Sequence, residues 1–138
     1  MRFIIPLVLC TACSPASLVD DNEALWAANG SPNYSMTVQR SCFCAETDPV
    51  DVVVEAGEVV SAVRQTDEGP EDLDPDGFEA YFSVPGLFGI AAEAESGADE
   101  VVIEYDAALG YPTLIDIDWV RNAVDDEEQY SVLSLSLE

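Results

Sequence analysis

The chain has 138 residues, 49% of them hydrophobic, and its 28 acidic residues against four arginines give a formal net charge of −24. This length and composition fit one domain with an apolar core. A chain so poor in cations excludes nucleic-acid binding, which depends on contacts from Lys and Arg to phosphate. Without histidine, lysine or a recognisable catalytic motif, we expect neither an enzymatic activity nor a cofactor.

The first residues have the pattern of a bacterial lipoprotein signal. Arg2 precedes a short apolar run, residues 3–9, well below the roughly 20 residues of a membrane-spanning helix. Ala12 then stands directly before Cys13, as in a lipobox. We therefore expect residues 1–12 to be removed as a signal peptide and Cys13 to be acylated, which anchors the protein to the membrane. An ordinary cleaved signal with a leftover cysteine is the alternative.

A tether and then a single domain are expected after this cysteine. Residues 13–22 are small, polar and acidic, which is typical of a flexible tether. The domain should occupy residues 23–138. Its first element is predicted to be a short helix, capped by Asp20 with an acidic residue three positions later, and ended by Gly30.

Strand patterns follow this helix. From Tyr34 onwards apolar and polar residues alternate, as in a half-buried strand. Residues 50–64 contain two β-branched runs around Ala56 and Gly57, which is a strong hairpin signal. Residues 66–79 are rich in acids and turn formers, so we expect an exposed acidic loop there.

The second half of the chain repeats this order. A helix is expected from the capping residue Ser83 to Gly97. Strands should follow at residues 100–106, 111–119 and 129–138. The order α-β-β-β-α-β-β-β predicts an α+β fold, an antiparallel β-sheet backed by two helices, and raises the hypothesis of a duplicated αβββ unit. One sheet and two sheets both remain compatible with the pattern.

Two cysteines, Cys42 and Cys44, continue the alternation of the first strand. They fall on the same side as its apolar residues, so we expect both to face the core, either bridged to each other or buried as two thiols. A thioredoxin-like motif needs two intervening residues, and a zinc site usually takes four nitrogen or sulfur ligands. The pair is therefore predicted to be structural.

One segment resembles a metal-binding loop. Asp72, Asp74 and Asp76, followed by Gly77, match the first half of an EF-hand. The twelfth position is Ser83, which cannot supply the bidentate carboxylate. A solvated acidic turn is the favoured interpretation, and a Ca²⁺ site is the alternative. A second group of acids surrounds the last hairpin and is another candidate for weak cation binding: Asp116, Asp118, Asp125, Asp126, Glu127 and Glu128.

Several segments together resemble a known family. They include "RSCFC" at 40–44, "IEYD" at 103–106 and "GYPT" at 110–113, and they resemble bacterial proteins grouped as domain of unknown function 6174 (DUF6174), many of which are small lipoproteins. The similarity covers nearly all of the mature chain. It implies a single domain located in the cell envelope, and it implies no activity, because none is assigned to the family.

The sequence thus favours a monomeric, membrane-anchored, non-enzymatic lipoprotein of the bacterial cell envelope. It is expected to bind another protein or an envelope component, with residues 110–113 and the last acidic hairpin exposed. In a Gram-negative host, Ser14 in place of an aspartate after the acylated cysteine predicts the periplasmic side of the outer membrane. The alternative function is a Ca²⁺-binding lipoprotein that uses residues 72–76.

Overall fold

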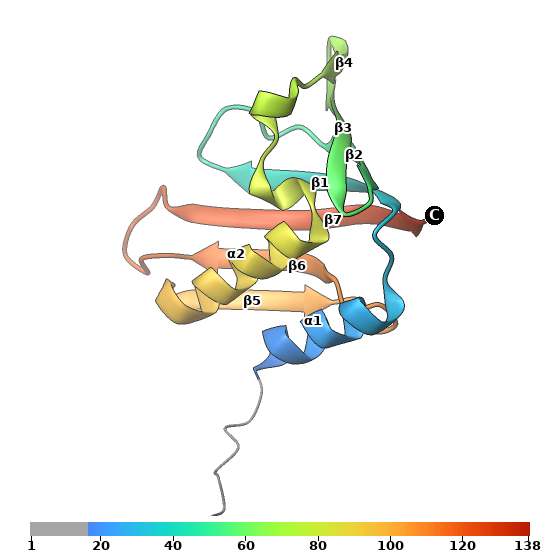
Figure 1. The fold of residues 1–138 in the computed structure, drawn as a ribbon. Helices are drawn as coiled ribbons and strands as arrows, with labels where there is room; N and C mark the ends of the chain where they lie inside the picture. Colours follow the sequence, from blue (N-terminus) through green and yellow to red (C-terminus); the bar gives the residue numbers. More distant parts are fainter. Residues whose placement is uncertain (1–16) are drawn as a thin grey trace, which may run out of the picture.

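The computed structural model describes residues 17–138, so the predicted signal peptide, Cys13 and the first part of the tether lie outside the described residues. Two helices and one large sheet make up the described chain (Figure 1). The helices are α1 (Leu18–Asn29) and α2 (Val84–Gly97), and two 3-10 turns, η1 (Pro75–Gly77) and η2 (Ala80–Phe82), precede α2. The strands are β1 (Tyr34–Cys42), β2 (Val50–Glu55), β3 (Glu58–Thr66), β4 (Gly69–Asp72), β5 (Glu100–Tyr105), β6 (Pro112–Asp118) and β7 (Glu127–Leu137).

All seven strands form a single antiparallel sheet in the order β4-β3-β2-β1-β7-β6-β5. This arrangement confirms the predicted α+β fold and leaves one sheet where the sequence was compatible with two. β1 and β7 pair in the middle of the sheet. From there outward, the strands of the first half follow in the order β1, β2, β3 and β4, and those of the second half in the order β7, β6 and β5.

Helix α1 begins earlier than the sequence predicted. Ser17 caps it: the Asp20 backbone N–H donates to Ser17 Oγ at 3.1 Å, and the Ser17 N–H donates to Asp20 Oδ2 at 3.4 Å. A serine with an acid three residues later satisfies two otherwise free N–H groups. The predicted cap at Asp20 is wrong, and residues 18–22, assigned to the tether, belong to the helix.

Helix α2 starts and ends where the sequence placed it. Ser83 caps it by accepting a hydrogen bond from the Gly86 N–H, and the helix ends at Gly97. A further bond joins helix and sheet, because the buried Val84 N–H donates to the Tyr34 hydroxyl at 2.9 Å. Both helices lie on one face of the sheet (Figure 1) and bury the apolar side chains of the strands.

The segment 66–79, predicted to be a loop throughout, contains regular structure. Its residues 69–72 pair with the end of β3 as the short edge strand β4, and η1 follows. Gly69 at φ 121° allows the tight turn between the two strands. The pairing depends on β3 extending past its apolar run, which local composition does not indicate.

Residues 110–113 are not the exposed surface that the sequence predicted. Gly110, Tyr111 and Pro112 are buried, and Tyr111 meets Trp26 of α1 edge-on, with 6.1 Å between ring centroids. Gly110 has φ 84°, and a Cβ there would lie 2.5 Å from the carbonyl oxygen of Asn22. Glycine and proline mark a turn in sequence, but here the turn packs beneath α1.

The other face of the sheet, called the outer face below, carries mostly polar side chains. Register places Gln39 opposite Ser131, Thr37 opposite Ser134 and Ser35 opposite Ser136 on the two central strands. Carboxylates occupy the flanking strands, for example Asp51 on β2. Among residues 17–138, both helices pack on the opposite side, which leaves this face open (Figure 1).

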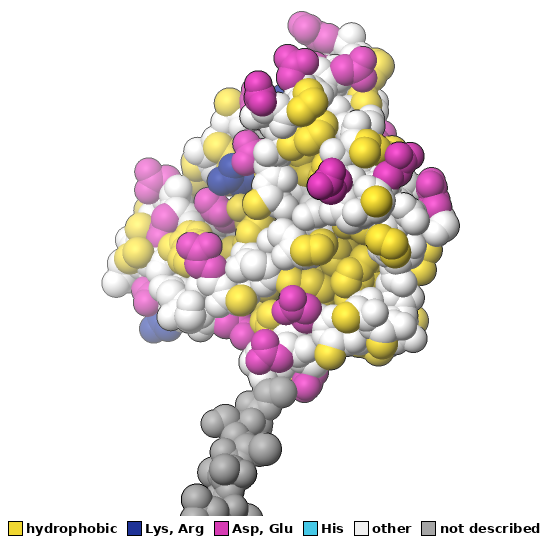
Figure 2. Space-filling view, in the orientation of Figure 1, with side chains coloured by type: hydrophobic (Ala, Val, Ile, Leu, Met, Phe, Trp, Pro, Cys, Tyr) yellow, Lys and Arg dark blue, Asp and Glu magenta, His cyan; other side chains and the backbone are white. Residues whose placement is uncertain are grey.

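Acidic residues are scattered over the helix-covered face instead of forming one block (Figure 2). Lys and Arg side chains appear there in only a few places (Figure 2). Charge spread in this way keeps a domain soluble, and it is screened within about 8 Å at physiological ionic strength. The net charge by itself therefore identifies no binding site.

Candidate functional site

The end of β1 carries the disulfide that the sequence left open. Cys42, the last residue of the strand, is bridged to Cys44, and their Cα atoms lie 5.2 Å apart. Cys42 is half-buried and Cys44 is exposed. The prediction that both cysteines face the core is wrong for Cys44, because β1 ends at Cys42 and the chain then leaves the sheet. Of the two predicted forms, the structure contains the bridged one.

Phe43, between the two cysteines, is 73% exposed. A phenylalanine in this position leaves most of its apolar surface in water, so it gains only a small part of the roughly 1.5 to 3 kcal/mol that full burial of such a side chain typically yields. Single exposed apolar residues are common on protein surfaces. This one differs in lying directly beside two sulfur atoms.

An ion pair lies on the inner face next to the bridge. Arg40 Nη2 is 3.0 Å from Glu128 Oε1, and the Tyr130 hydroxyl donates to Glu128 Oε2 at 2.9 Å. The Arg40 guanidinium also lies 5.9 Å from the centre of the Tyr130 ring. Burial, and after it the bond to Glu128, raises the pKa of Tyr130 well above its ordinary value. These contacts fasten the end of β1 to the start of β7.

A second arginine fastens the segment that follows the bridge. Arg64 of β3 is only 8% exposed and forms ion pairs with Glu46 and Glu71, each at 3.3 Å. Gln39 Nε2 donates to the Thr47 carbonyl oxygen at 3.0 Å in the same segment. Both carboxylates are largely exposed, so solvent weakens the ion pairs. Their role is to position the chain after Cys44.

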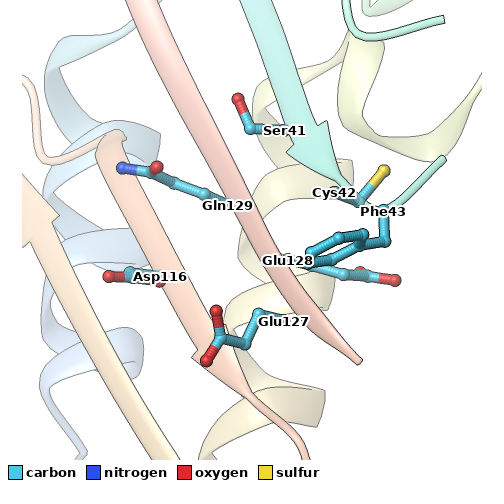
Figure 3. Close-up of a pocket in the computed structure, with 7 residues that line it drawn as sticks. All are labelled: Ser41, Cys42, Phe43, Asp116, Glu127, Glu128 and Gln129. Carbon is cyan, nitrogen blue, oxygen red and sulfur yellow. The ribbon is translucent and has the colours of Figure 1, made fainter. Parts of the chain in front are cut away.

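A shallow hollow of about 260 Å³ adjoins the bridge on the outer side of the sheet. Figure 3 shows its lining across β1, β7 and β6. The lining consists of Ser41, Cys42, Phe43, Asp116, Glu127, Glu128 and Gln129. It contains the carboxylates of Asp116 and Glu127 and the ring of Phe43, whereas the carboxylate of Glu128 is bonded to Arg40 on the inner face. No cationic residue belongs to the lining, so an anionic ligand is disfavoured there.

Carboxylates are crowded farther along β6 and in the turn before β7. Desolvation, and after it the nearby carboxylates of Asp126 and Glu100, raises the pKa of Asp118 above its ordinary value. Oδ1 of Asp118 and both carboxylate oxygens of Asp126 are buried without a hydrogen-bond partner. This part of the surface is thus electrostatically unfavourable in the free domain.

The two cation sites that the sequence offered as alternatives are not assembled in the described part of the chain. Within residues 17–138, no three or more Asp, Glu, Cys or His side chains are grouped so that they could hold a metal ion. Asp72 ends β4, Asp74 precedes η1 and Asp76 lies inside it. The three residues are thereby distributed over two different elements and do not form an EF-hand loop. The acids of the last hairpin likewise form no such group.

The comparison with known families decides what the chain is related to. A model described as a family of unknown function, DUF6174, matches residues 18–137. The chain belongs to this family. The match starts at the first residue of α1, so the DUF6174 domain coincides with the helices and the sheet described above.

The other two comparisons yielded nothing: no curated protein and no solved structure matches the chain. Neither helix of the described DUF6174 domain is long and apolar enough to cross a membrane. The acylation site predicted at Cys13 lies outside the described residues.

Sequence reasoning missed the role of Arg64. Its position was readable, since Ala62 and Arg64 alternate inward on β3, and an inward arginine requires a carboxylate partner. The partners themselves, Glu46 and Glu71, lie 18 and 7 residues away along the chain. No local pattern links such positions.

Proposed function

We propose that this protein is a lipid-anchored domain of the bacterial cell envelope, held to the membrane through Cys13, which binds a partner protein or envelope component and catalyses no reaction. The apolar run before Ala12 and Cys13 supports the anchor. In a Gram-negative host, Ser14 supports an outer-membrane position facing the periplasm.

The distance between anchor and domain supports binding close to the membrane. Ser17, which caps α1, is four residues after Cys13. A fully extended chain spans at most about 3.6 Å per residue, so the domain begins within about 14 Å of the acylated residue. The anchor therefore limits how the domain is oriented, and the surfaces away from the start of α1 are the accessible ones.

The observation that carries the binding proposal is the open outer face. Its central strands present serine, threonine and glutamine side chains that can donate and accept hydrogen bonds. In a sheet with helices on one side, the other side is normally solvated or occupied by a partner. The domain is acidic, so a partner with exposed Lys or Arg side chains fits its charge.

The anchor is tested by labelling cells with a fatty-acid probe. Wild type and Cys10→Ser should incorporate the probe equally, and Cys13→Ser should lose it and remain as an unprocessed precursor. Because both variants remove one cysteine from the same segment, the comparison isolates the acylated position. Equal labelling of Cys13→Ser and wild type would contradict the anchor.

The binding face is tested by placing a photo-crosslinking amino acid at Ser134, exposed on the outer face, and at Glu93, exposed on α2. In intact cells, Ser134 should give a discrete cross-linked product and Glu93 should give none. Products from Glu93 alone would assign binding to the helical face, and no product from either position would refute the proposed partner.

A further inference from the structure

We propose that the Cys42–Cys44 bridge is an exchangeable disulfide that accepts electrons from the dithiol of a partner protein. This proposal concerns the bridge at the end of β1, and it depends neither on the lipid anchor nor on a partner bound to the outer face. It replaces the structural role that the sequence favoured. Access to the sulfur atoms, the small loop that they close and the way the flanking chain is held all support it.

Access to the bridge is open on the side of Cys44. Cys44 is an exposed residue that belongs to no strand, and the neighbouring Phe43 is 73% exposed. Cys42 is half-buried and lines the hollow of about 260 Å³ (Figure 3). Attack in thiol–disulfide exchange requires a thiolate to reach one sulfur atom directly. Cys44 is the sulfur atom that a partner reaches first, and Phe43 offers an apolar contact beside it.

The bridge closes a loop with one intervening residue. A disulfide that stabilises a fold does so mainly by restricting the unfolded chain, and this effect decreases as the closed loop becomes shorter. Structural disulfides resist reduction, whereas exposed ones are the labile or catalytic class. An exposed bridge between residues 42 and 44 therefore has the properties of a labile disulfide and few of those of a structural one.

Contacts that do not involve sulfur hold both sides of the bridge. Before it, β1 pairs with β7 up to the register of Cys42 with Glu128. After it, Glu46 is paired with Arg64, and the Thr47 carbonyl oxygen accepts from Gln39. Opening the S–S bond leaves these contacts in place. The two thiols then remain close together and can form the bridge again, so both redox states are compatible with the folded domain.

The exchange balances as two substitutions at sulfur. A thiolate of the partner attacks Cys44 Sγ, the S–S bond breaks, and its electron pair leaves on Cys42 Sγ, which takes a proton from water. The second thiolate of the partner then attacks the partner's own sulfur in the mixed disulfide and releases Cys44 Sγ, which is protonated in turn. The domain ends with two thiols and the partner with one disulfide, a transfer of two electrons.

Digestion of the full chain with trypsin places the two bridged cysteines in one peptide. Cleavage after Arg40 and Arg64 yields a peptide, residues 41–64, that contains Cys42 and Cys44 but neither of the two N-terminal cysteines. The oxidised full-length protein is equilibrated without denaturant in buffers of increasing reduced-to-oxidised glutathione ratio. It is then alkylated, digested and analysed by mass spectrometry, with near-ultraviolet circular dichroism recorded in parallel.

The expected result is a gain of two alkyl groups on this peptide across the glutathione titration, with an unchanged dichroism spectrum. A peptide that stays unlabelled until denaturant is added would make the disulfide structural and overturn the proposal. Labelling before any reductant is added would show that the bridge does not form. Labelling that coincides with loss of the dichroism signal would show that reduction unfolds the domain.

The order of attack is tested with a matched pair of variants. Cys42→Ala retains only the exposed sulfur of the pair, and Cys44→Ala retains only the half-buried one. With oxidised glutathione, the tryptic peptide of Cys42→Ala should acquire the glutathione mass faster than that of Cys44→Ala. An equal rate, or a faster reaction at Cys42, would overturn Cys44 as the point of attack.

Discussion

The hydrogen bond between the Val84 N–H and the Tyr34 hydroxyl gives a sharp test of how helix and sheet are joined. Both residues are buried, with 0% and 2% of their surfaces exposed, and the bond is 2.9 Å long. Val84 is the first residue of α2, and N–H groups at that position have no acceptor within the helix. Tyr34→Phe removes only the oxygen atom and leaves this N–H buried without a partner.

A buried donor left unsatisfied costs about 1 to 3 kcal/mol. For a domain of this size, 1 kcal/mol corresponds to about 4 °C in melting temperature, so Tyr34→Phe should lower Tm by roughly 4 to 12 °C. Thermal unfolding of the oxidised protein measures Tm, and urea unfolding measures the free energy of unfolding.

The matched control is Tyr105→Phe. The Tyr105 hydroxyl is also buried, but it has no hydrogen-bond partner, so its removal should leave stability unchanged or raise it. Equal losses for the two variants would refute the reasoning, because the loss would then follow from removing any buried hydroxyl and not from the bond to α2.

Three further outcomes follow from the same structure. Gly110→Ala should lower the free energy of unfolding by more than about 1 kcal/mol, since φ is positive and the new Cβ would meet the carbonyl oxygen of Asn22. Gly77→Ala is the control, because its Cβ would lie in open space and should leave urea unfolding nearly unchanged. Asp118→Asn should raise Tm at pH 7 but not at pH 3. The pKa of Asp118 is raised in the folded state, so the ionised carboxylate disfavours the folded protein at pH 7, whereas at pH 3 the carboxyl is largely protonated in both states. Burial raises the pKa of Tyr105 to about 12, so between about pH 10 and 12 this tyrosine ionises in the unfolded chain before it ionises in the folded one. The stability of the wild type should therefore fall as the pH rises through this window. In thermal melts at alkaline pH, the stability of Tyr105→Phe should fall less.

The order of helices and strands was predictable because it depends on local periodicity. The alternation after Tyr34 and the two β-branched runs around Ala56 and Gly57 each identify a strand without knowledge of its partner. Helix α2 was equally clear, since Ser83 and Gly97 stand at its two ends. The family assignment also followed from short segments, such as residues 40–44 and 110–113, that can be recognised without knowledge of the fold.

The features that sequence reasoning missed depend on partners far away in the chain. β4 has the composition of a turn and becomes a strand only because β3 offers a free edge. Gly110 and Tyr111 have the composition of a surface turn and are buried only because α1 covers them. The alternation of β1 was extended two residues too far, to Cys44, because nothing local indicates that pairing with β7 stops at Cys42.

The size of its loop also sets how much the bridge contributes to stability. Applied to the three residues from Cys42 to Cys44, the chain-entropy relation gives about 1.6 kcal/mol, against 2 to 4 kcal/mol for typical disulfides. Cys44 is exposed, so its replacement removes little packing. Cys42→Ala/Cys44→Ala should therefore lose no more than about 2 kcal/mol in urea unfolding and match the reduced wild type. A much larger loss would mean that the domain requires the bridge to fold, and a disulfide that the fold requires cannot be opened and closed in exchange.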